Sequence, residues 1–262
     1  MKVIGILFLL LFPVTAFAAQ DPQISRLHEI LAQSAAAYES VRDYRAVFYK
    51  QEESAGKMGP REKIFLKFEK PFKIFMHWMD TRKKGLQVLY ERGKRDGKLA
   101  VHQPGLLFGL AQVVYLDQNS PWVREGSESY DIEDAGIGTF LRDFAKMVRA
   151  GTEQNKIRAQ VSLKPEGQEV DVSFPGSTPD GDYFASRTQV LFDARTRLPV
   201  RMSLYGWDGK LTGVYEYQEL NLNIGADDSE FKRIAERHLY KLYLPNLPKN
   251  PSKTNFSARA AS

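Results

Sequence analysis

The sequence predicts an α+β fold in which an antiparallel sheet of about 10–11 strands packs against two helices. Two stretches carry apolar side chains at helical spacing, about ten others alternate with a period of two, and turn-forming residues separate consecutive strands. Strands joined by short turns pair with their neighbours in the chain, which gives an antiparallel meander. Each amphipathic helix then has to bury its apolar stripe against one face of that sheet.

The first eighteen residues have the composition of a secretory signal peptide. Lys2 supplies a positive charge, residues 3–12 form an apolar run, and Ala16 and Ala18 are the small residues that a signal peptidase reads. The run is too short for a transmembrane helix, which needs about 20 apolar residues. We therefore expect cleavage after Ala18, a periplasmic location, and a single domain over residues 19–244.

Two amphipathic helices are expected, one before the strands and one in their middle. The first runs from about residue 24 to residue 42, and its apolar stripe is Ile24, Leu27, Leu31, Tyr38 and Val41. The second begins at Asp134 or the glycine that follows and ends at Gly151, and its stripe is Ile137, Phe140, Leu141, Phe144 and Val148. Both helices present one apolar side, so both should lie on the sheet.

The expected strands fall into two groups, one on each side of the second helix. The first group covers residues 44–53, 62–69, 73–80, 86–92 and 98–103. The second group covers residues 157–163, 170–174, 183–193, 200–207 and 210–218. Glycine- and proline-containing turns connect them, as in residues 54–60 and 93–97.

Three further segments have a less regular pattern. Leu106–Leu116 is almost entirely apolar with no clear period, which fits either a buried strand or a mobile apolar lid. Residues 229–240 are expected to form a last short helix. Residues 245–262 are rich in Pro, Lys, Asn and Ser, and we expect a disordered tail there.

Composition excludes several classes of function. The chain has no cysteine, which removes disulfides, lipid anchoring on cysteine, thiol nucleophiles and cysteine-based zinc sites. Its net charge of +5 is spread among interleaved acidic residues, so no nucleic-acid partner is expected. Nothing in the sequence requires an oligomer, and we expect a monomer.

No catalytic motif is present, and we expect neither an enzyme nor a bound cofactor or metal. None of the four histidines has a second histidine four residues away, and no serine lies in a G-x-S-x-G pattern. His77 and His102 lie in different expected strands and, with Asp80, form either a site or an ordinary pair of strand histidines. A hydrolase is left open, because carboxylate pairs for glycoside cleavage cannot be recognised from spacing alone.

Several expected strands are apolar on both faces. In residues 73–80, Ile74, Met76 and Trp78 point one way, while Phe75 and Met79 point the other. A sheet with one solvent face would alternate cleanly, so both faces of these strands should be covered. Either a filled core or an apolar groove for a ligand satisfies this pattern.

Five segments carry a resemblance to a known family. They are Tyr44–Phe48 (YRAVF), Lys67–Ile74 (KFEKPFKI), Gly93–Leu99 (GKRDGKL), Asp134–Gly138 (DAGIG) and Tyr217–Asn223 (YQELNLN). The chain is similar to an uncharacterised bacterial exported family whose fold resembles that of the LolA/LolB superfamily of periplasmic lipoprotein carriers. The resemblance implies an incomplete β-barrel, with helices on its concave side closing an apolar cavity that takes acyl chains.

The function expected on this basis is a periplasmic carrier of lipid or acylated lipoprotein that works with a membrane-associated donor or acceptor protein. The candidate cavity residues are Phe65, Phe75, Met79, Leu106, Leu107, Phe108, Tyr215 and Tyr217. By its position in the first strand, Arg45 is the candidate polar residue at the ligand entry. The alternative is a non-catalytic interaction or sensor module of the cell envelope, which uses exposed aromatic residues such as Trp122 and Trp207.

Overall fold

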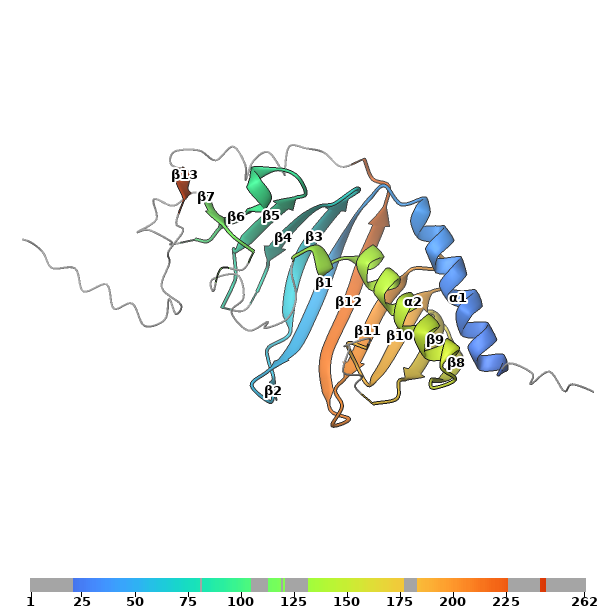
Figure 1. Ribbon diagram of the computed structural model, residues 1–262. Coiled ribbons are helices and arrows are strands. Elements are labelled where there is room, and N and C mark those ends of the chain that lie inside the picture. The colour runs from blue at the N-terminus through green and yellow to red at the C-terminus, as the bar shows by residue number, and fades with distance from the viewer. Residues whose placement is uncertain are drawn as a thin grey trace, which may run out of the picture.

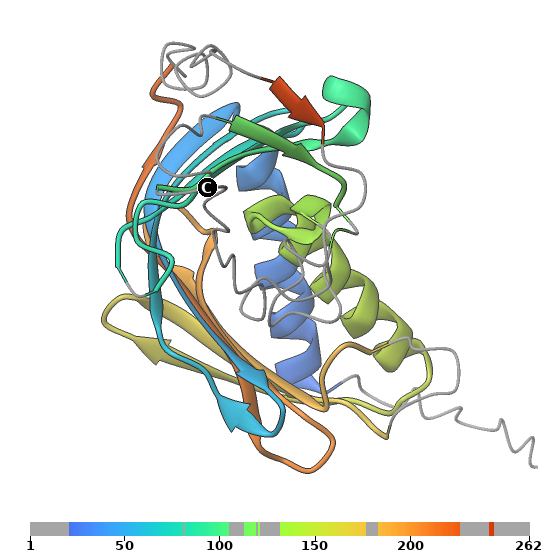
Figure 2. The ribbon, with the colours of Figure 1, turned by 90° about the vertical axis from the view of Figure 1, so that its left-hand side faces the viewer.

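The computed structural model describes residues 21–80, 82–104, 113–118, 120, 132–176, 183–225 and 241–243. In these residues a curved, open sheet carries two α-helices on its concave side (Figures 1 and 2). The expected α+β fold, an incomplete barrel with helices on the concave side, is therefore confirmed. The expected signal peptide lies outside the described residues.

The two helices begin and end within three residues of their expected bounds. Helix α1 (Pro22–Glu39) begins after Asp21, whose side chain accepts a hydrogen bond of 2.8 Å from the Gln23 amide. Helix α2 (Ile137–Glu153) begins after Gly136, which has a φ of 106°. A Cβ at that position would lie 3.2 Å from the Tyr44 hydroxyl, so both backbone and packing favour glycine.

The strands before α2 make up most of one half of the sheet. They are β1 (Asp43–Ser54), β2 (Lys57–Met58), β3 (Glu62–Glu69), β4 (Lys73–Trp78), β5 (Gln87–Glu91), β6 (Leu99–His102) and β7 (Val113–Leu116). A 3-10 turn, η1 (Arg95–Gly97), joins β5 to β6, and another, η3 (Ile132–Asp134), precedes α2. We refer to β3–β7 as the N-terminal half-sheet.

The strands after α2 make up the other half. They are β8 (Arg158–Lys164), β9 (Gly167–Ser173), β10 (Arg187–Asp193), β11 (Pro199–Tyr205), β12 (Leu211–Leu222) and β13 (Lys241–Tyr243). We refer to β8–β12 as the C-terminal half-sheet. Strand β13 is not part of it, because it pairs in parallel with β7 at the opposite edge.

The strand order is β13-β7-β6-β5-β4-β3-β1-β12-β11-β10-β9-β8. Pairing of β1 with β12, from Tyr44 opposite Leu222 to Glu52 opposite Gly213, joins the two halves. Eleven strands match the expected ones or the end of the apolar insert, and the sequence analysis missed only the two- and three-residue strands β2 and β13.

The remaining sequence predictions fall partly outside the described residues. The last four residues of the apolar insert Leu106–Leu116 form β7 and are buried, as a strand would be. Residues 105–112, the expected helix over residues 229–240 and the expected tail over residues 245–262 lie outside the described residues.

One large hydrophobic core lies between the concave face of the sheet and the helices. Leu27 of α1 and Phe144 of α2 are fully buried in it, together with Tyr44 and Tyr217 from the two central strands. Since β1 and β12 are adjacent, their aromatic rings form the centre of this core. Phe48 packs within it, with its ring tilted against that of Tyr217 at 4.7 Å between centroids.

Candidate functional site

The concave face of the N-terminal half-sheet is a continuous apolar surface. Alternation along each strand turns one set of side chains toward this face, and each member is at most 9% exposed. We call this set the inner apolar layer: Ile74, Met76, Trp78, Val88, Tyr90, Leu99, Val101, Val114 and Leu116. The layer therefore runs as buried hydrocarbon across the four neighbouring strands β4–β7.

The two helices lie mainly over the other half. Helix α1 lies beside β8 and α2, and α2 begins where the Ile137 amide donates a 3.2 Å hydrogen bond to the Tyr44 hydroxyl (Figure 1). The 3-10 turn η3 reaches the inner apolar layer through the hydrogen bond from Tyr90 of β5 to Glu133. The inner apolar layer is therefore the part of the concave face that the described helices leave uncovered.

The convex face of the same half-sheet carries a second, separate hydrophobic cluster. We call it the outer apolar cluster: Phe65, Phe75, Leu89, Ala100, Val113 and Tyr115. Its members come from β3 to β7, and the rings of Phe65 and Phe75 meet edge to face at 6.4 Å. The expected two-sided apolarity of these strands is thus confirmed.

The structure does not bring the candidate cavity residues together. Phe65 and Phe75 belong to the outer apolar cluster, whereas Tyr215 and Tyr217 face the main core on the other side of the sheet. Placing all four in one cavity was wrong, because alternation gives the two faces of each strand but not which faces of distant strands coincide. Leu106, Leu107 and Phe108 lie outside the described residues.

Two more candidates lie at the surface. Met79 follows the last residue of β4 and is 42% exposed, so it does not line an enclosed cavity. Arg45 is exposed in β1 between its strand partners Lys67 and Asn221. Since Tyr44 and Ala46 on either side face the core, Arg45 points to the convex face and away from the inner apolar layer.

The tyrosine hydroxyls expected to meet a polar head group have different surroundings. The Tyr215 hydroxyl donates a 2.8 Å hydrogen bond to Glu52 Oε1. Burial raises the pKa of Tyr217, so this phenol stays neutral at physiological pH. Tyr44 and Phe48, which the sequence analysis did not select, complete this aromatic group. Tyr44 and Phe48 are four residues apart and so share one face of β1, which was the signal available in the sequence.

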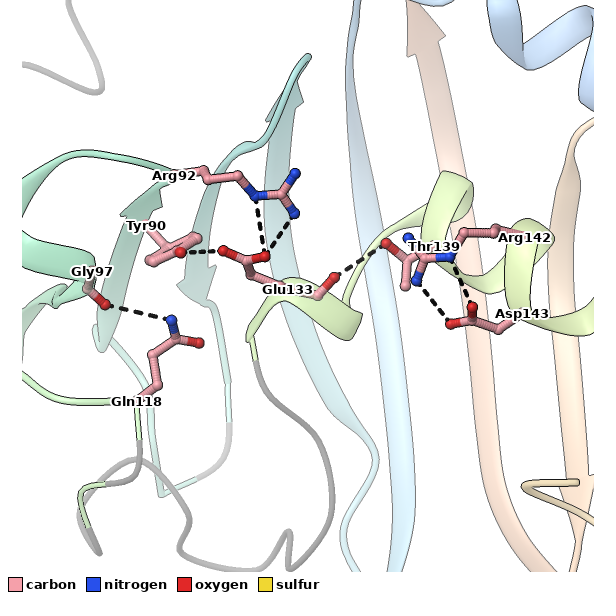
Figure 3. Close-up of polar contacts among 8 residues, drawn as sticks. All are labelled: Tyr90, Arg92, Gly97, Gln118, Glu133, Thr139, Arg142 and Asp143. Atoms are coloured by element: carbon pink, nitrogen blue, oxygen red, sulfur yellow. Dashed lines mark hydrogen bonds and ion pairs between the residues drawn. The ribbon is translucent and has the colours of Figure 1, made fainter. Parts of the chain in front are cut away.

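A polar cluster around Glu133 closes one end of the inner apolar layer (Figure 3). Tyr90 donates a short hydrogen bond to Glu133 Oε1, and Arg92 approaches Oε2 through Nη2 at 2.6 Å and Nε at 3.1 Å. The Arg92 guanidinium lowers the pKa of the Glu133 carboxyl. The Thr139 hydroxyl donates to the Glu133 carbonyl at 3.1 Å, so one residue ties β5 to the start of α2.

The two strand histidines come close but do not form the site considered with Asp80. His77 and His102 are both register partners of Gln87 in β5, so they flank it on the convex face. Burial and the charge of His102 lower the pKa of His77. Asp80 instead accepts a 2.8 Å hydrogen bond from the Lys63 amide at the start of β3.

The convex face of the C-terminal half-sheet is polar. It holds a shallow pocket of about 400 Å³ lined by Arg158, Ala159, Gln160, Asp171, Ser173 and Arg187. Arg187 pairs with Asp171, and Gln189 Nε2 donates to the same carboxylate at 2.8 Å. The bond to Arg187, and then that to Gln189, lower the pKa of the Asp171 carboxyl. Asp171, Arg187 and Gln189 thus bond to one another, as is typical of a solvated surface.

No group of three or more His, Cys, Asp or Glu side chains in the described residues is placed to hold a metal ion. Neither described helix has the length and apolar character that crossing a bilayer requires.

The sequence matches the model of one protein family, described as "Protein of unknown function (DUF1571)", over residues 41–252. Because the match covers most of the chain, the protein belongs to this family. No curated protein matches the sequence.

Solved structures with a similar arrangement share little sequence with this chain. LppX, a lipoprotein of Mycobacterium tuberculosis, is 10% identical with a TM-score of 0.43, over 78% of this chain and 99% of its own. A LolA superfamily protein of Nitrosomonas europaea is 10% identical with a TM-score of 0.34, over 78% and 96%. A putative outer membrane lipoprotein-sorting protein domain of Vibrio parahaemolyticus is 13% identical with a TM-score of 0.40, over 80% and 97%. A LolA superfamily protein, as expected from the sequence, is thus among the solved structures with which this chain shares a distant similarity.

Proposed function

We propose that this member of the DUF1571 family is an exported, periplasmic carrier that holds the acyl chains of a lipid or lipoprotein against the inner apolar layer. One observation carries the proposal: an open, curved sheet whose concave apolar face extends over β4–β7, beyond the part that the described helices cover. Each methylene group moved from water onto such a surface is worth about 0.8 kcal/mol. A chain of ordinary length therefore supplies ample binding free energy.

The Glu133 cluster supports the proposal by giving this apolar face a polar end. Tyr90 belongs to the inner apolar layer, and its hydroxyl lies against Glu133 and Arg92 at the edge (Figure 3). Arg92 keeps a half-exposed guanidinium there, with a side chain 49% exposed. A lipid bound in this way would place its acyl chain along the inner apolar layer and its polar head group near Arg92.

The proposal is tested first by native mass spectrometry of protein purified from its own periplasm without detergent. We expect a reproducible adduct of lipid mass, and extraction then names its chemical class. A clean protein mass, with no binding of added phospholipid or acylated peptide, contradicts the carrier function.

A matched pair of variants locates the binding surface. Val101 faces the inner apolar layer and Val113 faces the outer apolar cluster, on neighbouring strands and with similar burial, 9% and 4% exposed. We expect Val101→Asn to weaken acyl binding several-fold more than Val113→Asn, while both lower the melting temperature comparably. Equal effects on binding would place the ligand elsewhere.

One observation favours the alternative function, a non-catalytic interaction or sensor module of the cell envelope. The side chains of the inner apolar layer are already buried, with Ile74 at 0% and Leu99 at 1% exposed. A filled core of this kind needs no ligand. The clean protein mass described above is the outcome that this alternative predicts.

A further inference from the structure

The turn between β4 and β5 combines an exposed apolar side chain with unpaired cations. Met79 is 42% exposed, and Arg82 and Lys84 are exposed as well. Within the described residues, neither Arg82 nor Lys84 forms a hydrogen bond or an ion pair. We call Met79, Asp80 and residues 82–84 the basic turn.

The basic turn is held in place by its neighbours. Lys83 Nζ lies 2.8 Å from Glu62 Oε1, and the other oxygen of this carboxylate accepts a 2.8 Å hydrogen bond from Trp78 Nε1. The backbone closes the turn with a 2.8 Å hydrogen bond from the Gly85 amide to the Trp78 carbonyl. Arg82 and Lys84 therefore belong to a turn that is bonded to the sheet, and binding has to order mainly their side chains.

The charge around the turn is one-sided. Residues 62–63 and 79–84 carry four cations, Lys63, Arg82, Lys83 and Lys84, and two carboxylates, Glu62 and Asp80, which is a net charge of +2. Glu62 is largely buried and bonded to Trp78 and Lys83, and Asp80 caps β3. The solvent therefore meets mainly cations around an apolar thioether, a combination suited to the surface of an anionic bilayer.

We propose that the basic turn docks the protein on the surface of an anionic lipid bilayer, with Met79 reaching the acyl boundary and Arg82 and Lys84 on the lipid phosphates. The turn joins the ends of β4 and β5, where Trp78 and Val88 of the inner apolar layer lie. Docking there would bring the inner apolar layer to the membrane, and the role of docking in lipid transfer rests on the proposed carrier function. Binding of the protein to the bilayer is measured independently of acyl-chain binding.

The test is flotation of the protein lacking residues 1–18 with vesicles of phosphatidylglycerol and phosphatidylcholine, or of phosphatidylcholine alone. We expect binding to the anionic vesicles only, weakening as salt is added. The double variant Arg82→Gln/Lys84→Gln should lower the partition coefficient about tenfold or more, since each basic residue at a membrane surface contributes appreciably. Met79→Ser should weaken binding at high salt as well.

The matched control is Lys146→Gln/Arg149→Gln, which removes the same charge from exposed positions of α2. If vesicle binding depends on the basic turn and not only on the net charge of the protein, this control should bind vesicles within about twofold of the wild type. Equal binding to neutral vesicles, wild-type binding by the basic-turn variant, or an equal loss in the control would each overturn the proposal. Vesicle binding without any acyl adduct would retain the docking surface and reject the carrier.

Discussion

The two halves of the sheet differ in the polarity of their convex faces. In the C-terminal half-sheet this face is polar, with Asp171, Arg187 and Gln189 bonded to one another and the helices packed on the concave side. In the N-terminal half-sheet, Phe75 and Leu89 on the convex face are 6% and 1% exposed, while the opposite face carries the inner apolar layer. The C-terminal half-sheet alternates as a sheet with one solvent-exposed face, whereas the N-terminal half-sheet is apolar on both faces.

This difference indicates where a ligand would belong. The C-terminal half-sheet satisfies its apolar face with α1 and α2, which complete an ordinary core. The N-terminal half-sheet has more apolar surface than the described helices cover. The surplus is the physical basis of the proposed acyl-binding surface.

The largest expected effect comes from charging the outer apolar cluster. Leu89→Asp places a carboxylate at a position 1% exposed, which should lower the free energy of unfolding by about 3–5 kcal/mol. Leu163→Asp on β8, at a position 81% exposed, should leave it nearly unchanged. Urea unfolding measures the free energy of unfolding of both variants. Similar losses in the two would contradict the claim that the two halves of the sheet differ in how deeply their apolar side chains are buried.

A smaller effect is expected where α2 meets the central strands. The Tyr44 hydroxyl accepts a hydrogen bond of 3.2 Å from the Ile137 amide at the helix start, so Tyr44→Phe should cost about 1 kcal/mol of unfolding free energy. Tyr217→Phe removes a hydroxyl from the same aromatic group and serves as the control. If the two variants melt at the same temperature, the Tyr44 hydroxyl does not stabilise the start of α2.

The smallest effect concerns the pair that ties β5 to η3. Because Arg92 lowers the pKa of Glu133, this pair stabilises the fold above the ordinary carboxyl pKa of about 4.3, and its contribution is lost as the pH falls through the lowered value. The side chains are partly exposed, so Glu133→Gln should cost about 1 kcal/mol or less at pH 7. Thermal melts recorded from pH 7 downward should show the difference between variant and wild type shrinking as the Glu133 carboxyl becomes protonated.

Local patterns were enough to predict most of the elements. The apolar stripes placed both helices to within three residues, and turn residues separated ten of the strands. The two-sided apolarity of residues 73–80 also predicted correctly that both faces are covered there. These features depend on neighbours a few residues apart, which the sequence states directly.

The candidate site could be predicted only in part, because it depends on which faces of distant strands coincide. Phe65 and Tyr217 were assigned to one cavity, yet Phe65 points to the convex face and Tyr217 to the core. Phe48 is the register partner of both Ile64 and Tyr217, and this pairing decides which faces of the three strands coincide. The pairing of Phe48 with Tyr217 joins segments about 170 residues apart, which local spacing does not reveal. Glu133 was missed for the same reason, since its partners Tyr90 and Arg92 are distant in the chain.

The sequence by itself determined the class of the fold, its two helices, its long strands and the excess of apolar residues in β3–β7, since each follows from spacing along the chain. Only the tertiary structure decided that this excess divides into an inner apolar layer and an outer apolar cluster, and that Met79 stands exposed among cations. The physical reason is that alternation fixes two faces for every strand, while long-range pairing through β1 and β12 decides which face meets the helices.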